Sequence, residues 1–450
     1  MSIPWSLGLI GCALAGFALS GLPGFLLRRR PAAAQGCSVA LAALAAALGL
    51  AGVALVFRQG AAAAEIAAWR ILGEPARVGV DALSAFFLVP VFLMGGLGAL
   101  YGLGYWPQRR HPANGARLRA AWGLTAAGMG LILVSRHALA FLLGWELMAL
   151  SAFFLITADD HLAESRRAGW IYLAATHVST LALFAFFLLW RQATGSFLLA
   201  PPAAPLAPVT AATLFGLALL GFGIKAGLMP FHFWLPGAHA NAPSHVSALM
   251  SGVVLKMGIY GLVRFLTLVP DPPPAWGGIL LFAGAASGLL GILFAIAQAD
   301  LKRLLAYSSV ENIGIILMGL GLALLGRSMH QPGWVVLGLA GALLHVWNHA
   351  LFKSLLFLGA GAVLHGAQTR QIDRMGGLAK AMPWTAACFL AGAVAICGLP
   401  PMNGFAGEWL LYLGLLKTLP GPGVGAAFAV PALAMIGALA VAAFVKVYGI

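Results

Sequence analysis

Charged side chains recur inside long apolar stretches of this sequence, where an ionised group is costly. A charged side chain at the centre of a bilayer costs at least about 2.5–3.5 kcal/mol. Such residues persist where they pair, line water or act on an ion. The basic ones are Lys225, Lys256, Lys353 and Lys446, and the acidic ones are Glu146, Glu311 and Glu408.

Titratable groups strung through apolar segments are what a proton relay needs. Burial favours the neutral form of both lysine and glutamate, and a nearby opposite charge reverses that preference. A partner that moves can therefore switch a lysine between holding and releasing its proton, and we expect Glu146 and Lys225 to form such a pair. Three histidines join the candidate pathway: His232, His345 and His349.

The alternative for each of these residues, taken alone, is a static buried ion pair or a long side chain that reaches the membrane surface. For His177, a simple hydrogen bond to a neighbouring helix is an equally good interpretation. The static interpretation is strongest for Lys446, which lies close to the end of the sequence. It weakens when six or more such residues occur in at least six different segments.

Composition indicates that the segments carrying these groups lie in a membrane. Hydrophobic residues make up 61% of the 450 residues and charged residues only 8%, whereas a soluble domain carries about 25% charged residues. Too few polar residues remain to cover a soluble core, which excludes a soluble enzyme. The net charge of +14 lies in short loops without interleaved aromatics, which favours membrane topology over nucleic-acid binding.

Apolar runs of about 20 residues predict an all-α polytopic bundle without strand-like alternation. The stretch 58–80 is expected to be an amphipathic connection. About thirteen spans are expected, near 4–27, 32–57, 81–106, 120–135, 138–157, 168–190, 211–235, 245–269, 277–299, 304–326, 333–366, 383–418 and 426–450.

Proline pairs predict that two of these spans are broken. The seventh contains Pro230 and Pro236, and the twelfth contains Pro400 and Pro401. Proline removes a helix hydrogen bond, and broken helices in matching positions of two halves indicate a transport site.

The charged residues also fall at matching places in two sets of spans. One set holds Glu146, Lys225 and Lys256, and the other, five spans later, holds Glu311, Glu408 and Lys446. An offset of five spans predicts two inverted repeats. We therefore expect N-terminal helices over 1–119, a first five-helix repeat over 120–269 and a second, incomplete one over 277–450.

Loop charges favour an N-terminus outside the membrane, because this orientation places fourteen basic residues in inside loops and eight in outside loops. We expect a bacterial inner-membrane location. The last span runs into Ile450 without a polar loop, so we expect further spans beyond it.

Several stretches resemble the proton-translocating, antiporter-like membrane subunits of respiratory complex I, of multisubunit sodium/proton antiporters and of membrane-bound hydrogenases. These stretches are 144–256, 306–314, 349–359 and 398–410. The resemblance implies that Glu146 pairs with Lys225, that Lys256 continues the path, and that His349, Lys353 and Glu408 complete it.

One departure from the complex I pattern is informative. Glu311 and Asn312 follow the tenth-span serines where many complex I members have Ser-His. The motif around Glu311 is more similar to the large membrane subunit of hydrogenase-4 and formate hydrogenlyase. The same holds for the twelfth-span motif Pro-Pro-Met-Asn-Gly-Phe-Ala-Gly-Glu-Trp. The departure leaves the central relay open between Glu311 and His345.

The resemblance implies that this chain holds no cofactor or metal, and that nickel–iron, iron–sulfur or flavin centres belong to partner subunits. It implies further membrane subunits and a peripheral hydrogenase or dehydrogenase arm. Three functions stay open: a proton-pumping subunit of a redox complex, a subunit of a sodium/proton antiporter without redox partners, and a scaffold that moves no ion.

Overall fold

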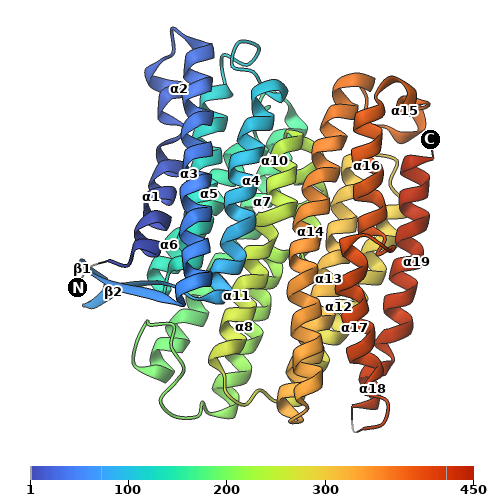
Figure 1. Ribbon diagram of the computed structural model, residues 1–450. Helices are drawn as coiled ribbons and strands as arrows, with labels where there is room; N and C mark the ends of the chain where they lie inside the picture. Colours follow the sequence, from blue (N-terminus) through green and yellow to red (C-terminus); the bar gives the residue numbers. More distant parts are fainter. Residues whose placement is uncertain (1–2, 72, 422, 450) are drawn as a thin grey trace. The chain divides into compact units, whose positions relative to one another are not determined.

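The structure is a computed structural model that describes residues 3–71, 73–421 and 423–449. It is mostly helical (Figure 1). Among the described residues, eleven helical stretches are long and apolar enough to cross a membrane. Two predicted spans, near 120–135 and 383–418, form helices that are not among these eleven, so the number of thirteen spans stays a prediction.

The chain divides into two compact units. The first contains residues 1–225 and 241–268, and the second contains 226–240 and 269–450. This division differs from the expected one in two ways. Residues 1–119 belong to the same unit as the first predicted repeat, and the short segment 226–240 packs with the second unit.

The first unit is a bundle of long helices with a short helix after the first. Its elements are α1 (Trp5–Leu19), α2 (Leu22–Leu26), α3 (Pro31–Gln59), α4 (Ala82–Tyr105), α5 (Gly115–Val134), α6 (Ala138–Ile156), α7 (Ala163–Thr194), α8 (Pro208–Ala226), α10 (Ser244–Leu249), the π-helical turn η2 (Met250–Val254) and α11 (Leu255–Leu268). The last three form one segment without a gap, Ser244–Leu268.

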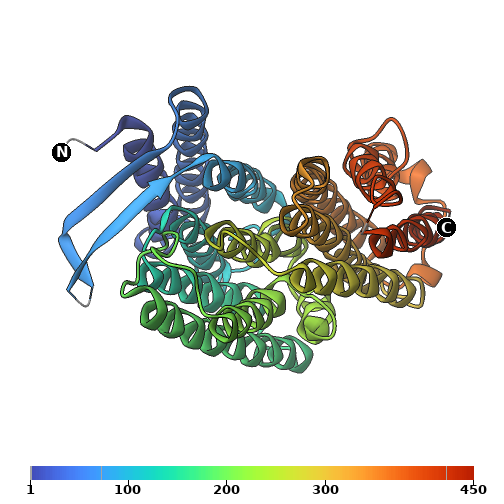
Figure 2. The ribbon, with the colours of Figure 1, turned by 90° about the horizontal axis from the view of Figure 1, so that it is seen from below.

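A β-hairpin forms at 62–80, within the stretch expected to be an amphipathic connection, and is the one paired-strand element of an otherwise helical chain among the described residues. Strands β1 (Ala62–Ile71) and β2 (Glu74–Val80) pair antiparallel and extend away from the helices of the first unit (Figure 2). Gly73 in the turn has a φ of +85°, which glycine adopts without strain. Glu65 and Arg77 form a cross-strand ion pair, a pairing that a search for apolar runs does not detect.

The second unit contains the remaining helices. They are η1 (Phe231–Trp234), α9 (Leu235–Asn241), α12 (Pro274–Ile296), α13 (Leu301–Ser328), α14 (Pro332–Ala367), η3 (Ile372–Arg374), α15 (Leu378–Ala381), α16 (Pro383–Ile396), α17 (Asn403–Leu416), α18 (Val424–Ala427) and α19 (Ala429–Tyr448). Helix α13 packs between α12 and α14.

Both segments with two prolines are interrupted. Helix α8 ends at Ala226, and only the 3-10 turn η1 and the short α9 follow it. Helix α16 ends at Ile396, and α17 begins at Asn403 after the turn that holds Pro400 and Pro401. Gly398 in this turn has a φ of +62°. Each break releases backbone groups that a continuous helix would satisfy internally.

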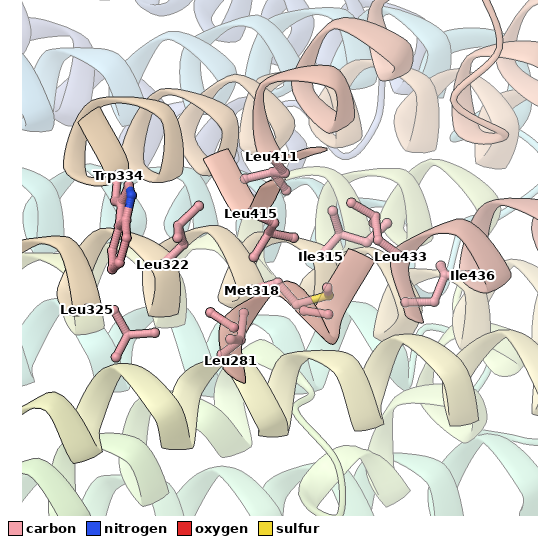
Figure 3. Close-up of a cluster of buried hydrophobic side chains, with 12 residues drawn as sticks. Leu281, Ile315, Met318, Leu322, Leu325, Trp334, Leu411, Leu415, Leu433 and Ile436 are labelled. Atoms are coloured by element: carbon pink, nitrogen blue, oxygen red, sulfur yellow. The ribbon is translucent and has the colours of Figure 1, made fainter. Parts of the chain in front are cut away.

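An apolar cluster holds the helices of the second unit together (Figure 3). Met318 and Leu322 of α13, Leu411 of α17 and Leu433 of α19 are fully or almost fully buried in it. In lipid, close packing of this kind rather than exclusion of water holds helices together. The cluster therefore fixes α13, α17 and α19, each of which carries a predicted site residue.

Candidate proton-transfer sites

Lys225 lies in the last turn of α8, with its side chain fully buried. Its ammonium donates a hydrogen bond to the Tyr172 hydroxyl of α7 at 3.0 Å. It also lies over the ring of Tyr172, 5.0 Å from the centroid, and over that of Trp145, at 5.8 Å. Aromatic faces and a hydroxyl stabilise a buried cation without neutralising it.

Glu146 follows Trp145 in α6, so it belongs to the same cluster and interacts with the charge of Lys225. It accepts a hydrogen bond from the Thr180 hydroxyl of α7, and His177 lies 4.0 Å away. Among the described residues, the ion pairs within 4.0 Å do not include Glu146 with Lys225. Glu146 and Lys225 therefore share a site without direct contact.

A close approach of two helices positions Glu146. A Cβ atom on Gly144 of α6 would lie 2.9 Å from the Ile132 backbone nitrogen and 3.0 Å from the Gly128 carbonyl oxygen of α5. Only glycine lets the two backbones come this near. Because Gly144 precedes Glu146 by two residues, this contact fixes the part of α6 that carries the carboxylate.

Lys256 is the second fully buried lysine of the first unit. Its ammonium donates a hydrogen bond to the Ser251 carbonyl oxygen at 2.5 Å. Ser251 lies in η2, where the helix widens to a π-helical turn, a feature that occurs often at functional sites. The widened turn thus supplies the oxygen that holds the lysine.

Lys353 of α14 lies in the second unit. It is fully buried, and its ammonium donates to the Leu305 carbonyl oxygen at 2.7 Å and to the Ser308 hydroxyl at 2.5 Å, both in α13. Glu311 lies one turn after Ser308 and interacts with the charge of Lys353. One carboxylate oxygen of Glu311 is buried without a hydrogen-bond partner among the described residues.

Glu408 of α17 lies against the break that precedes its helix. A Cβ on Gly398 would lie 2.6 Å from a Glu408 carboxylate oxygen, so the absence of a side chain at Gly398 makes room for the carboxylate. Glu408 is 6% exposed, and its charge interacts with that of Glu311. The break therefore holds a carboxylate beside the Glu311–Lys353 group.

Histidine and amide side chains line the same part of the second unit. A ring nitrogen of His345 lies 2.9 Å from the Asn312 side-chain oxygen, and the Asn312 amide donates to the Ser308 carbonyl at 2.8 Å. Ser308 also binds Lys353, so His345 and Glu311 both belong to this cluster. His349 is fully buried one turn after His345.

Two predicted pathway residues lie apart from these clusters. The half-buried ring of His232 in η1 contacts Phe294 and Tyr307, with centroids 6.4 and 5.9 Å apart. Lys446 donates to the carbonyl oxygens of Ile296 and Gln298, at 3.0 and 2.9 Å. These carbonyls end α12, so Lys446 caps a helix.

Sequence reasoning missed the neutral groups that hold the buried charges. Tyr172, Thr180 and Ser308 are common types in apolar helices, and only their neighbours in space give them a role. The sequence does not show that each hydroxyl lies on a helix next to the one that carries the charged residue. Among the described residues, no group of three or more His, Cys, Asp or Glu side chains is arranged to hold a metal ion.

The structure combines a bundle of apolar helices, two of them interrupted, with one Glu–Lys cluster in each unit. These features define a polytopic membrane protein of the ion-translocating class. The family model described as "NADH:quinone oxidoreductase/Mrp antiporter, TM" matches residues 135–430. The chain belongs to this family, which confirms the resemblance found in the sequence.

Within this family, the chain is similar to two membrane subunits of hydrogenase complexes. Hydrogenase-4 component B of Escherichia coli (strain K12) is 45% identical over 383 residues, covering 82% of this chain and 56% of that protein. Formate hydrogenlyase subunit 3 of the same strain is 38% identical over 381 residues, covering 83% of this chain and 60% of that protein. The chain thus spans little more than half the length of these relatives.

Solved structures share the fold. The Mrp complex from Dietzia sp. DQ12-45-1b contains a chain that matches with a TM-score of 0.84 at 25% identity, covering 98% of this chain and 46% of that one. A chain of the archaeal membrane-bound sulfane sulfur reductase matches with a TM-score of 0.80 at 23% identity, covering 96% of this chain and 69% of that one. The second likeness shows the fold alone.

Proposed function

We propose that this chain is the proton-translocating membrane subunit of a redox-driven complex of the hydrogenase-4 or formate-hydrogenlyase type. The observation that carries the proposal is the way its buried lysines are held. Lys225 is bound by a tyrosine hydroxyl, and Lys353 by a carbonyl and a serine hydroxyl. A glutamate lies in each cluster and interacts with the lysine through space.

Neutral acceptors suit a lysine that gains and loses a proton. A lysine in direct contact with a carboxylate would leave an uncompensated buried charge when it deprotonates, at a cost of about 3–5 kcal/mol. Here the hydroxyls of Tyr172 and Ser308 can accept from the ammonium or donate to the neutral amine. Each glutamate then favours the protonated lysine by an amount that depends on its own charge.

The proposal assigns different tasks to the two units. In the first, Glu146 biases Lys225, and Lys256 continues the path. In the second, Lys353 exchanges its proton with the group formed by Glu311, His345 and His349, and Glu408 releases it at the broken helix. The redox centres would belong to partner subunits, and the chain would lie in the bacterial inner membrane with its N-terminus outside.

Proton uptake by inverted membrane vesicles that contain the full complex tests the function. Lys225→Met and Lys353→Met should each abolish proton movement while the complex assembles. Lys380→Met, which removes an exposed lysine between η3 and α16, should keep the wild-type rate. Wild-type proton uptake in both buried-lysine variants would refute the proposal and favour a scaffold.

Likeness to the Mrp complex supports a second candidate function, in which the chain belongs to a cation/proton antiporter without redox partners. The description of the matching family also names the Mrp antiporter. In the same vesicles, proton movement driven by a sodium or potassium gradient without an electron donor would favour this candidate. Proton movement that requires the electron donor and ignores both cations would favour the first.

A further inference from the structure

A small cavity with several polar side chains in a mostly apolar lining lies in the first unit among α3, α4, α5 and α10. Its volume is about 30 Å³, and its polar lining includes Gln35, Ser38, Arg119 and His245. A space of this size with several polar partners has room for one or two water molecules. None of these side chains belongs to the Lys225 cluster.

Buried polar atoms in this cavity lack protein partners. The Nε and Nη2 atoms of Arg119 and the hydroxyl of Ser38 are buried without a hydrogen-bond partner among the described residues. Ser38 is only 3% exposed. A buried polar group left without a partner costs about 1–3 kcal/mol, so water in the cavity would remove a substantial penalty.

A wider groove lies on the outer side of this cavity. It has a volume of about 580 Å³, and its lining includes Arg28 after α2, Gln108 and Arg109 between α4 and α5, and Arg117 in the first turn of α5. The Gln108 backbone N–H donates to the Gln35 side-chain oxygen at 2.9 Å. Gln108 lines the groove and Gln35 lines the cavity, so this hydrogen bond joins the linings of the two spaces.

On its inner side the cavity ends at His245, which is 1% exposed. The rings of Tyr105 and Trp122 pack against the imidazole, with centroids 5.5 and 5.4 Å away. The Tyr105 hydroxyl bonds the hydroxyl of Ser244, next to His245, at 3.1 Å. The histidine thus brings the segment Ser244–Leu268, which also carries Lys256, to the wall of the cavity.

A row of serines continues from this point toward Lys256. Ser244, Ser247 and Ser251 are fully buried, and their spacing of three and four residues puts them on one face of the helix. The row ends at the residue whose carbonyl binds the Lys256 ammonium at 2.5 Å. About 15 Å of helix separates His245 from Lys256, a distance that a proton crosses only through intermediate hydroxyls or waters.

We propose that the groove, the cavity, His245 and this serine row form an access path that delivers protons from the side of the basic loops to Lys256. A proton carried by cavity water binds one ring nitrogen of His245, and the other ring nitrogen releases a proton toward the serine row. Imidazole suits this step because it has two nitrogens that exchange the roles of donor and acceptor. The inference rests on the proposed function, since it assigns the route by which that function obtains its protons.

Proton uptake by vesicles containing the full complex tests the path, with His245→Gln compared with wild type and with His161→Gln. His161 is an exposed histidine in the connection after α6. His245→Gln should assemble and slow proton uptake at least fivefold, and His161→Gln should keep the wild-type rate. If His245→Gln fails to assemble, Ser38→Val, which fills the cavity with an apolar side chain, should slow uptake in the same way.

The outcomes separate the path from the function. Wild-type uptake in His245→Gln together with loss of uptake in Lys225→Met overturns the path and leaves the function standing. Wild-type uptake in His245→Gln, Lys225→Met and Lys353→Met overturns the function as well. Loss of uptake in His245→Gln and Lys225→Met, with His161→Gln unchanged, supports both the path and the function.

Hydroxyl-radical footprinting of the wild-type complex gives a second readout that does not depend on transport. Radiolysis of bound water oxidises side chains beside it, so Trp122 at the cavity should be modified several times faster than Trp190. The two tryptophans are 3% and 0% exposed, so bulk solvent reaches neither well. Equal protection of both would show a dry cavity and overturn the path.

Discussion

Lys225 donates its hydrogen bond to the Tyr172 hydroxyl, 3.0 Å away, while Glu146 of the same cluster accepts from Thr180. The lysine and the glutamate therefore have separate hydrogen-bond partners and act on each other only through space. This arrangement lets the glutamate bias the charge of the lysine without fixing it. The sequence predicted the two charged residues, but not the hydroxyls of Tyr172 and Thr180 in α7 that bind them.

Removing the Tyr172 hydroxyl should weaken the protonated form of Lys225. Tyr172→Phe keeps the ring but deletes a hydrogen bond to a charged group, which is worth about 1.5–3 kcal/mol. We expect proton uptake by vesicles containing the full complex to fall by about tenfold or more, with normal assembly.

Tyr448→Phe is the matched control for this variant. Tyr448 lies at the end of α19, is 39% exposed and makes no hydrogen bond through its hydroxyl among the described residues. Its loss should leave uptake unchanged. An unchanged rate in Tyr172→Phe would mean that the aromatic faces alone hold the lysine.

Sequence patterns predicted the membrane bundle, the two interrupted segments and the buried charges, because each rests on composition or on one residue type. Charged side chains are so rare within lipid that Lys225 is conspicuous without a structure, and consecutive prolines such as Pro400 and Pro401 predict a break because each removes a helix hydrogen bond. The partners of the charges could not be predicted, since Tyr172 and Ser308 are chemically ordinary and matter only through their position on a neighbouring helix. The hairpin at 62–80 was missed because a short two-stranded ribbon has no long apolar run.

The second unit offers a comparable test at Ser308, whose hydroxyl binds Lys353. In Ser308→Ala the ammonium keeps the Leu305 carbonyl but loses one acceptor, worth about 1–2 kcal/mol. We expect proton uptake to fall by about fivefold. Ser328→Ala in the same helix is the control, because that hydroxyl bonds the Leu324 carbonyl at 3.1 Å, which does not bind the lysine. Equal rates in the two variants would contradict a specific role for Ser308.

The lowered pKa of the Asp81 carboxyl predicts how the stability of the folded protein depends on pH. Burial by itself raises the pKa of this carboxyl, but the hydrogen bonds and charge of Arg264, the charge of Arg136 and the Ser84 N–H together lower its pKa below the usual range. Because the pKa is lower in the folded state, the stabilisation is fully present well above pH 3.8, the usual value. It is lost as the pH falls from there through the lower folded pKa.

Thermal unfolding of the detergent-solubilised protein between pH 3 and 7 checks this prediction. At pH 7, Asp81→Asn should lower stability by about 1–2 kcal/mol, a discounted value because the Asp81 side chain is 36% exposed. The difference from wild type should shrink toward pH 3. Glu65→Gln, which breaks the exposed pair with Arg77, should cost less than about 0.5 kcal/mol. A difference that grows as the pH falls would reverse the predicted sign.

A variant of Lys446, which is half-buried in α19, tests whether every lysine within the predicted spans of this chain conducts protons. Its ammonium caps the carbonyl end of α12, and a cation there is favoured by the helix dipole as well as by hydrogen bonds. Lys446→Met should therefore lower the midpoint of thermal unfolding, at a cost of about 1–2 kcal/mol, while the assembled complex keeps its proton uptake.

Lys417→Met removes an exposed lysine after α17 and should change neither quantity. If Lys446→Met instead keeps its stability and loses proton uptake, the cap is incidental and Lys446 belongs to the pathway. If stability falls and uptake persists, a lysine's position within a predicted span is shown to be insufficient for conduction in this fold. The distinguishing feature of Lys225 and Lys353 would then be a hydroxyl acceptor with a glutamate within electrostatic reach, a combination that the contacts of Lys446 do not include.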